Sequence, residues 1–259
     1  SFRDLRIGLD CANGSAWNIA KSVFDALGAK TYVTGAEPDG LNINVDCGST
    51  HIENLQKLVK ENHLDVGFAF DGDADRAMFV DERGEFIQPD YLTPFVADAT
   101  FSSLGLKSEG QSVIYDVRTS RGAIETLAEM GCKGVMVPVG HAFAKPILRE
   151  TGAVCGGELA GHYYFREFFG CDSGVLAALR ILKCVANAAA EGNSASVMVA
   201  KVNLRYANSG ELNFKVDDKD AAIARALDVA SRELPAEISR SGMDGVRIEY
   251  ASGWINIRK

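Results

Sequence analysis

The stretch that organises this chain runs from Val66 to Val80 and reads VGFAFDGDADRAMFV. Two apolar runs, 66–70 and 77–80, are typical of buried β-strands, and they flank an acidic hexapeptide, Asp71 to Arg76. The hexapeptide places three carboxylates within five residues, and these repel one another unless a cation lies among them. Carboxylate oxygens at alternate positions suit Mg²⁺ or Ca²⁺, and open α/β sheets bind ligands at the ends of their strands. A metal-binding loop between two strands is one interpretation of this stretch.

Two other interpretations of the hexapeptide compete with a metal site. An acidic surface turn is the first, because Asp and Gly are common turn residues. The second is an EF-hand, in which Glu82 would be the twelfth residue counted from Asp71. An EF-hand needs glycine at its sixth position, where this chain has Arg76, and helices rather than strands flank such a loop. We set the EF-hand aside, and the choice between turn and metal site depends on the rest of the chain.

The composition is that of an ordinary globular protein. The chain has 259 residues, of which 47% are hydrophobic and 24% charged, so it can form two or three domains. Its net charge of -8 disfavours a nucleic-acid partner, and its apolar runs are far shorter than the roughly 20 residues of a membrane helix. The six cysteines are scattered, and residues 1–4 do not show the pattern of a signal peptide. We expect reduced thiols and a cytoplasmic protein without a membrane partner.

Residues 1–85 alternate between strand and helix patterns. Apolar positions recur with helical spacing in two segments, and short β-forming runs separate them. The predicted elements are a strand at 5–10, a helix at 16–27, a strand at 31–33, a helix at 52–62, and the strands on either side of the acidic loop. This order predicts a first α/β domain, which carries the acidic loop.

Residues 86–201 repeat this kind of order, and residues 202–259 differ from it. The second region is predicted to hold helices at 90–104, 122–130, 142–150 and 172–190, with strands at 113–117, 135–139 and 153–159. The third is predicted to hold a strand at 210–216, a helix at 218–234 and a hairpin over 246–257. The expected fold is therefore α/β, with two similar α/β domains built on mixed sheets and a truncated α+β segment after them.

Three further loops that follow predicted strands carry polar side chains with chemical potential. They hold paired arginines, a histidine with a lysine, and a glutamate with a histidine: Arg118 and Arg121, His141 and Lys145, Glu158 and His162. Each alone is explained by an ordinary turn or helix start. Together with the acidic loop they suit a metal-assisted reaction on a phosphorylated polyol, since Arg binds phosphate well and Glu with His can bind hydroxyls or move protons.

At this point the sequence resembles a known family. Asp71 to Arg76 is similar to the metal loop of the α-D-phosphohexomutases, and Gly157 to His162, which reads GELAGH, is similar to their sugar-recognition loop. Gly140 and His141 lie between the two loops at a spacing that also fits. The resemblance covers essentially the whole chain, which looks like the second and third domains of such an enzyme and the start of the fourth.

The resemblance implies roles for individual residues. The acidic loop would hold Mg²⁺, Arg76 would lie beside the metal, and two cleft residues would be acid/base or electrostatic candidates. The sugar loop would bind hydroxyls, although Ala160 stands where the family usually has serine. The implied metal ligands are Asp71, Asp73 and Asp75, the implied catalytic residues are Arg76, Arg118 and His141, and the implied substrate-binding positions are Glu158, Ala160 and His162.

The resemblance also implies a reaction and its partners. In the family a phosphoserine donates its phosphoryl group to a hexose phosphate, and a hexose 1,6-bisphosphate then returns the other phosphate to the serine. Such a transfer depends mainly on positioning and on neutralisation of charge. The serine belongs to the family's first domain and a phosphate-binding loop to its fourth. We therefore expect residues 1–259 alone, without those missing domains, to be inactive.

The choice of sugar depends on shorter segments. Tyr163 to Glu167 and Asp172 to Gly174 look more like phosphomannomutase/phosphoglucomutase, whereas Leu41 to Asn44 and Cys47 to Thr50 look more like phosphoglucosamine mutase. We favour mannose and glucose phosphates, because the first two segments lie nearer the chemistry. A metal-dependent sugar phosphatase and a non-catalytic sugar-phosphate sensor are the competing functions.

Overall fold

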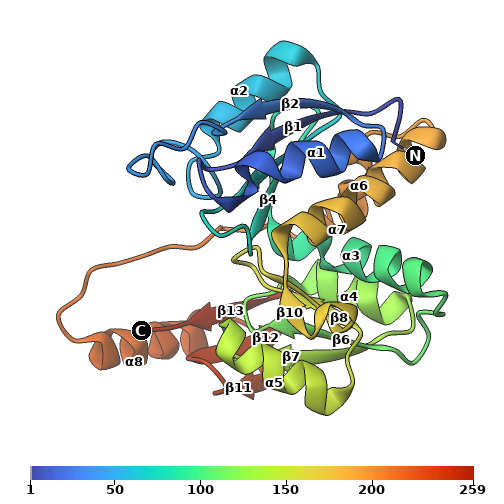
Figure 1. Ribbon diagram of the computed structural model, residues 1–259. Helices are drawn as coiled ribbons and strands as arrows, with labels where there is room; N and C mark the ends of the chain where they lie inside the picture. The colour runs from blue at the N-terminus through green and yellow to red at the C-terminus, as the bar shows by residue number, and fades with distance from the viewer. Residues whose placement is uncertain (1) are drawn as a thin grey trace.

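Two five-stranded mixed sheets and a three-stranded antiparallel sheet form the framework of the protein, and helices cover them (Figure 1). This computed structural model describes residues 2–259. The predicted fold class, two α/β units followed by a smaller α+β segment, is confirmed. Within the described residues, no helix is both long and apolar enough to cross a bilayer.

The first sheet carries the acidic loop. Its strand order is β2-β1-β3-β4-β5, with β1 parallel to β2 and β3, and β4 antiparallel to its neighbours. All five residues of β3 are buried, which explains why its sequence is apolar throughout rather than alternating. The elements are β1 Arg6–Asp10, η1 Ser15–Asn18, α1 Ala20–Ala26, β2 Lys30–Thr34, α2 Glu53–Asn62, β3 Val66–Phe70, β4 Ala77–Asp81 and β5 Phe86–Ile87.

The second sheet has the order β10-β9-β8-β6-β7, with β6 parallel to both β7 and β8. The strands are β6 Ser112–Asp116, β7 Lys133–Val137, β8 Cys155–Gly157, β9 Tyr163–Phe165 and β10 Cys171–Asp172. Its helices are α3 Pro89–Leu104, α4 Arg121–Glu129, α5 His141–Thr151, η2 Arg166–Phe168, α6 Gly174–Ala190 and α7 Ala195–Asn203.

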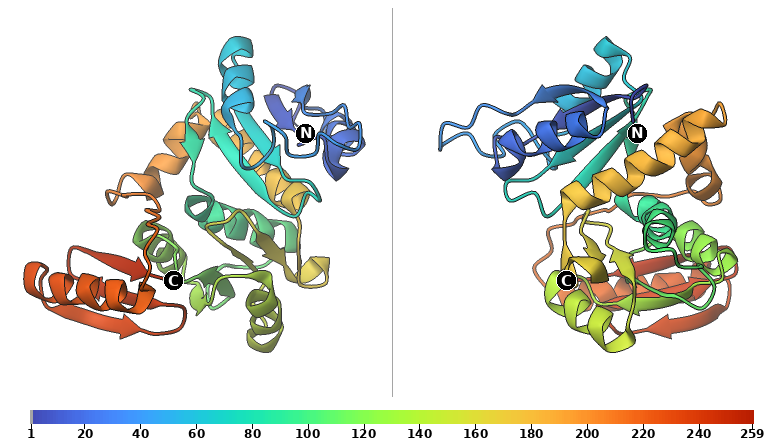
Figure 2. Two further views of the ribbon diagram at one scale, coloured as in Figure 1. Left: turned by 90° about the vertical axis from the view of Figure 1, so that its left-hand side faces the viewer. Right: turned by 45° about the vertical axis from the view of Figure 1, so that its right-hand side comes forward.

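Helices α3 and α6 connect the two sheets into one apolar core. They pack against each other, α6 also contacts β3 and β4, and Figure 2 shows α6 running between the two sheets. A chain of aromatic contacts crosses the same region: the ring centroids of Phe68 and Phe79 are 5.6 Å apart, and those of Phe79 and Tyr163 are 5.9 Å apart. This shared core holds the loops of the two sheets in a fixed relation, because packed interiors resist deformation.

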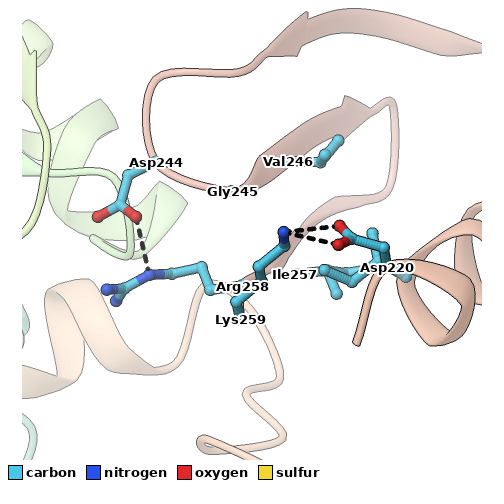
Figure 3. A pocket seen from close by; sticks show the side chains of 8 residues that line it. Asp220, Asp244, Gly245, Val246, Ile257, Arg258 and Lys259 are labelled. Carbon is cyan, nitrogen blue, oxygen red and sulfur yellow. Dashed lines mark hydrogen bonds and ion pairs between the residues drawn. The ribbon is translucent and has the colours of Figure 1, made fainter. Parts of the chain in front are cut away.

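The C-terminal segment forms a small separate layer. Helix α8 Lys219–Glu233 precedes the antiparallel strands β11 Glu237–Ser241, β12 Val246–Tyr250 and β13 Gly253–Ile257. Figure 3 shows a pocket between α8 and this sheet, where Lys259 pairs with Asp220 and Arg258 pairs with Asp244. The hairpin over 246–257 is confirmed as β12 and β13.

Several predicted elements differ from the structure. The strand predicted at 153–159, for example, covers only Cys155–Gly157. The predicted strand at 210–216 is wrong. This segment is exposed, and no strand of residues 2–259 pairs with it, so it has no partner for interstrand hydrogen bonds despite its alternating apolar residues. The strand predicted at 135–139 is displaced to Lys133–Val137, because Pro138 has no amide hydrogen to continue pairing. The helix predicted at 16–27 begins as a 3₁₀ turn, and regular α-helix starts only at Ala20.

Candidate functional site

The acidic loop joins β3 to β4 at the end of the first sheet. Asp71 is buried, Asp75 is partly buried and Asp73 is exposed. One carboxylate oxygen from each of the three lies within 4.8 Å of the others. Ala74 adopts a positive φ of 61°, and this left-handed turn lets the chain reverse between the second and third carboxylates. The three predicted metal ligands are therefore brought together.

Backbone contacts hold this loop on two sides. The amide of Ser15 donates to the carbonyl of Gly72 at 2.8 Å, and the amide of Gly174 donates to the carbonyl of Ala74 at 3.0 Å. The approach at Gly14 is so close that a Cβ there would lie 2.4 Å from the Gly72 carbonyl oxygen. Glycine at position 14 is thus required by contact rather than by turn geometry.

Arg76 supplies one positive charge at the loop. Its Nε lies 2.6 Å from Oδ2 of Asp71 and 3.9 Å from Oδ1 of Asp75, and its amide donates to Asp71 Oδ1 at 3.1 Å. A charge-assisted pair of this kind fixes the orientation of the Asp71 carboxylate. One arginine offsets only part of the charge of three aspartates, so the loop keeps a net negative charge.

The loop fits a divalent cation. Oδ1 of Asp75 is buried, and no donor among residues 2–259 lies within hydrogen-bond distance of it. The pKa of Asp75 is raised to about 6: burial is the main cause, His162 opposes it, and the charges of Asp71 and Asp73 add to it. A cation bound among the three oxygens would relieve this repulsion and would satisfy the orphaned oxygen.

The predicted sugar loop connects β8 to β9 and lies directly against the acidic loop. The amide of Glu158 donates to the carbonyl of His162 at 2.9 Å, and Gly161 completes the turn with a φ of 88°. The amide of Ala77 donates to the carbonyl of Gly161 at 3.0 Å, and Arg76 and His162 form an isolated antiparallel β-bridge. The two loops, which belong to different sheets, therefore share backbone hydrogen bonds.

Glu158 is held in a buried position by a tyrosine. Its side chain is 1% exposed, and its Oε1 accepts a hydrogen bond from the hydroxyl of Tyr164 at 2.5 Å. Burial raises the pKa of Glu158, while the hydrogen bond from Tyr164 lowers it in part. A buried carboxylate with a fixed orientation can accept a hydrogen bond from a sugar hydroxyl. Ala160, two residues further on, offers no side-chain polar group.

His162 lies between two carboxylates. Its Nδ1 is 2.9 Å from Asp172 Oδ2 and 3.7 Å from Asp75 Oδ2, and Lys145 Nζ is 2.8 Å from the other oxygen of Asp172. Burial alone would lower the pKa of His162, but the hydrogen bond that its Nδ1 donates to Asp172 and the charge of Asp75 raise it above its ordinary value. The ring is thereby biased toward its cationic form, which suits an anionic substrate.

Arg118 and His141 border the same region. The Arg118 guanidinium pairs with buried Asp116 at 2.7 Å, and the other donor to that same oxygen is the amide of Leu159, at 3.0 Å, in the sugar loop. His141 begins α5 and is exposed, with its ring centroid 6.3 Å from that of His162. The predicted site residues therefore gather around the two loops, with Arg118 and His141 at the margin.

Four site residues were missed as such by the sequence reasoning: Asp116, Tyr164, Asp172 and Gly174. Asp116 ends a predicted strand just before Arg118, which could have indicated its role. Asp172 and Gly174, like Tyr164, were considered only as members of segments that gave a clue to the sugar. No local pattern marks Tyr164, because its contact with Glu158 depends on the pairing of β8 with β9.

Comparison with known families gives two matches. The family described as "Phosphoglucomutase/phosphomannomutase, alpha/beta/alpha domain II" matches residues 1–84. The companion description, "alpha/beta/alpha domain III", matches residues 88–205. The acidic loop falls in the first match and the sugar loop in the second.

Individual relatives agree with these matches. The chain is 39% identical to the phosphoglucosamine mutase of Lachnospira eligens over 97% of its own length and 57% of that protein. It is 43% identical to the phosphoglucosamine mutase of Lachnoclostridium phytofermentans over 71% of its own length and 40% of that protein. The chain thus spans about half the length of the curated relatives that it matches.

Solved structures share the fold. A phosphoglucomutase/phosphomannomutase family protein from Burkholderia thailandensis is 30% identical and superposes with a TM-score of 0.80, over 96% of this chain and 52% of that one. The phosphoglucomutase of Paramecium, at 18% identity and a TM-score of 0.73, covers 97% of this chain and 49% of its own. From the matched domains and the gathered loops together, we conclude that the chain belongs to the α-D-phosphohexomutase family.

Proposed function

We propose that the protein is a phosphohexomutase that moves a phosphoryl group between the 1- and 6-positions of a hexose phosphate. The observation that carries this proposal is the backbone bridge between Arg76 and His162, which joins the metal loop to the sugar loop. A phosphoryl acceptor on the sugar would then lie beside the metal, as phosphoryl transfer requires.

Asp71, Asp73 and Asp75 would hold Mg²⁺, with a serine phosphate as a further ligand. The structure of an Aspergillus fumigatus N-acetylphosphoglucosamine mutase, which is 16% identical, is described as a complex with GlcNAc-6P and magnesium. When bound, the ion would neutralise charge on the transferring phosphoryl group. Arg76 would keep Asp71 oriented through its 2.6 Å contact.

The remaining roles fall to residues around the cleft. Arg118 would stabilise charge near the reacting hydroxyl, because its guanidinium is fixed by Asp116. His141 would be the acid/base candidate, since it is exposed at the start of α5 and its ring centroid lies 6.3 Å from that of His162. Glu158 and His162 would bind hydroxyls of the sugar, one as an acceptor and the other as a donor.

Two assignments of the sugar are candidates. The named relatives are phosphoglucosamine mutases, which favours glucosamine phosphate. The segments Tyr163 to Glu167 and Asp172 to Gly174 favour mannose and glucose phosphates, and the structure brings both segments close to the sugar loop, through Tyr164 and Asp172. A hexose 1,6-bisphosphate would be the intermediate in either case. The six cysteines are free thiols, which supports a cytoplasmic location.

The test is turnover by the full-length protein. Mannose, glucose and glucosamine 1-phosphates are compared with Mg²⁺ and a bisphosphate activator, and the 6-phosphate and free phosphate are both quantified. We expect 6-phosphate formation that needs the activator, with little free phosphate. Release of free phosphate without an activator would identify a phosphatase. Saturable binding with no product would identify a non-catalytic sensor.

A further inference from the structure

One arginine of the C-terminal segment is buried against the loop that carries Arg118. Arg247 lies on β12 and its side chain is 2% exposed. Its guanidinium carbon is 4.1 Å from the ring centroid of Trp254, and its Nε donates to Glu249 Oε1 at 2.7 Å. Ring and carboxylate therefore fix the plane of the guanidinium from two directions.

The free end of this guanidinium reaches the loop that carries Arg118. Nη1 of Arg247 donates to the carbonyl of Val117 and, at 3.1 Å, to the carbonyl of Thr119. These two carbonyls belong to the residues directly before and after Arg118. A rotation of either peptide would break a bond from a buried charge, which is costly, so the backbone on both sides of Arg118 is restrained.

Neighbouring contacts extend the same interface. Oδ2 of Asp244 accepts a hydrogen bond from the amide of Val139 at 3.0 Å, shortly before His141. Nη1 of Arg121 donates to the carbonyls of Tyr250 and Ala251, each at 3.1 Å. The small C-terminal sheet thus touches the loops that lead to both marginal site residues, and Figure 1 shows it beside β6, β7 and α5.

We propose that Arg247 is a positioning residue for Arg118. Its paired bonds to Val117 and Thr119 restrain the backbone from which the Arg118 side chain reaches Asp116 beside the sugar loop, so the C-terminal segment contributes to the phosphoryl-transfer site without touching the substrate. This inference rests on the proposed function only in giving Arg118 a role in phosphoryl transfer. The restraint on the loop itself follows from the contacts alone.

The experiment compares three variants of the full-length protein. Arg247→Met removes the donors and keeps an apolar stem, whereas Arg247→Lys keeps the charge with a single donor point. Arg240→Met is the matched control, because Arg240 lies on β11 of the same sheet in an exposed pair with Glu237. Hydrogen–deuterium exchange of residues 117–120 measures how mobile the backbone of this loop is. The values of kcat and KM are measured for the hexose phosphate that the protein turns over.

For Arg247→Met we expect faster exchange at 117–120 and a kcat lower by about 10- to 100-fold, with KM changed little, since displacement of a catalytic group by ~1 Å has this effect. Arg247→Lys should fall between this variant and the wild type, and Arg240→Met should match the wild type. In an Arg118→Ala background, Arg247→Met should lower kcat no further, because the two residues act through one group.

Unchanged exchange at 117–120 in a folded Arg247→Met variant would overturn the proposal, as would additive losses in the double variant. If Arg247→Met does not fold, the proposal is tested with Arg247→Lys instead, by its exchange at 117–120 and by its effect on kcat in the Arg118→Ala background. Absence of any turnover in the wild type would refute the proposed mutase function. Even then, the exchange measurement would still show whether Arg247 restrains the loop.

Discussion

Gly174 lies against the backbone of Arg76, so that a Cβ at position 174 would come within 2.4 Å of the Arg76 carbonyl oxygen. Gly174 is the first residue of α6, and its amide donates to the carbonyl of Ala74. The start of a helix from one half of the protein is thereby seated on the acidic loop of the other half.

Gly174→Ala should push the acidic loop away from α6. Because the obstacle is backbone rather than a flexible side chain, we expect a loss of about 1–3 kcal/mol in stability and weaker binding of Mg²⁺. The measurement is the Mg²⁺ dependence of turnover together with thermal unfolding. Gly242→Ala is the control, since a Cβ there meets nothing within 4 Å. Equal Mg²⁺ affinity in both variants would show that the contact does not position the loop.

Asp73→Asn should weaken Mg²⁺ binding with little change in stability. Asp73 is exposed and near two other carboxylates, so its removal takes away a ligand without leaving a buried group unpaired. We expect the Mg²⁺ concentration for half-maximal turnover to rise at least about tenfold. Asp4→Asn, at an exposed position far along the chain from the loop, should leave it unchanged. A normal Mg²⁺ dependence in Asp73→Asn would argue for a simple acidic turn.

Tyr164→Phe should impair both stability and sugar binding. The hydroxyl of Tyr164 donates a hydrogen bond to the buried Glu158 carboxylate, and its loss leaves that carboxylate without its 2.5 Å donor. We expect about 1–3 kcal/mol of destabilisation and a higher KM. Tyr206→Phe removes a comparable 2.7 Å bond to Glu125 near the surface and should destabilise the protein much less than Tyr164→Phe does. Similar effects of the two substitutions would contradict a special role for Tyr164.

Asp90 should make stability depend on pH. Burial raises its pKa to about 6, although hydrogen bonds from Ser120 oppose the shift. The folded state then binds this proton more tightly than the unfolded state, so the contribution of Asp90 to stability falls as pH rises from about 4 to about 6. Asp90→Asn should therefore be more stable than wild type at pH 8, by about 1–3 kcal/mol, and equal to it near pH 4.

Thermal unfolding at the two pH values tests this prediction. Asp98→Asn on the same helix is the control, because Asp98 is exposed and should show no such difference. A gain in stability that is equal at both pH values would contradict the linkage to Asp90.

The sequence was most informative where a strand or helix is long and its pattern strong. Strands β1, β3 and β4 and helices α2, α3 and α8 lie close to where periodicity placed them. The strands β5, β9 and β10 have two or three residues each and offer no period to detect. Helix α7 was also missed. At 210–216 the alternation of Leu212, Phe214 and Val216 predicted a strand, but pairing needs a neighbour that residues 2–259 do not place there.

In the candidate site, too, only contacts between residues close in sequence could be predicted. The carboxylates of Asp71, Asp73 and Asp75 are adjacent in sequence, so their proximity could be predicted. The contact of His162 with Asp172, and that of Arg247 with the carbonyls beside Arg118, join residues from separate strands and loops. Such contacts follow from strand pairing and packing, which one sequence without relatives does not specify.

The bridge between Arg76 and His162 has a consequence for engineering specificity. A sugar loop taken from a relative would have its own backbone conformation at Gly161 and His162. Any difference there would displace the acidic loop and its aspartates, because the two loops share the bridge and its hydrogen bonds. Loop exchange should therefore succeed only when residues 74–77, 158–162 and 172–174 travel together as a single cassette, and a chimera that carries 158–162 alone should lose metal affinity along with its old substrate.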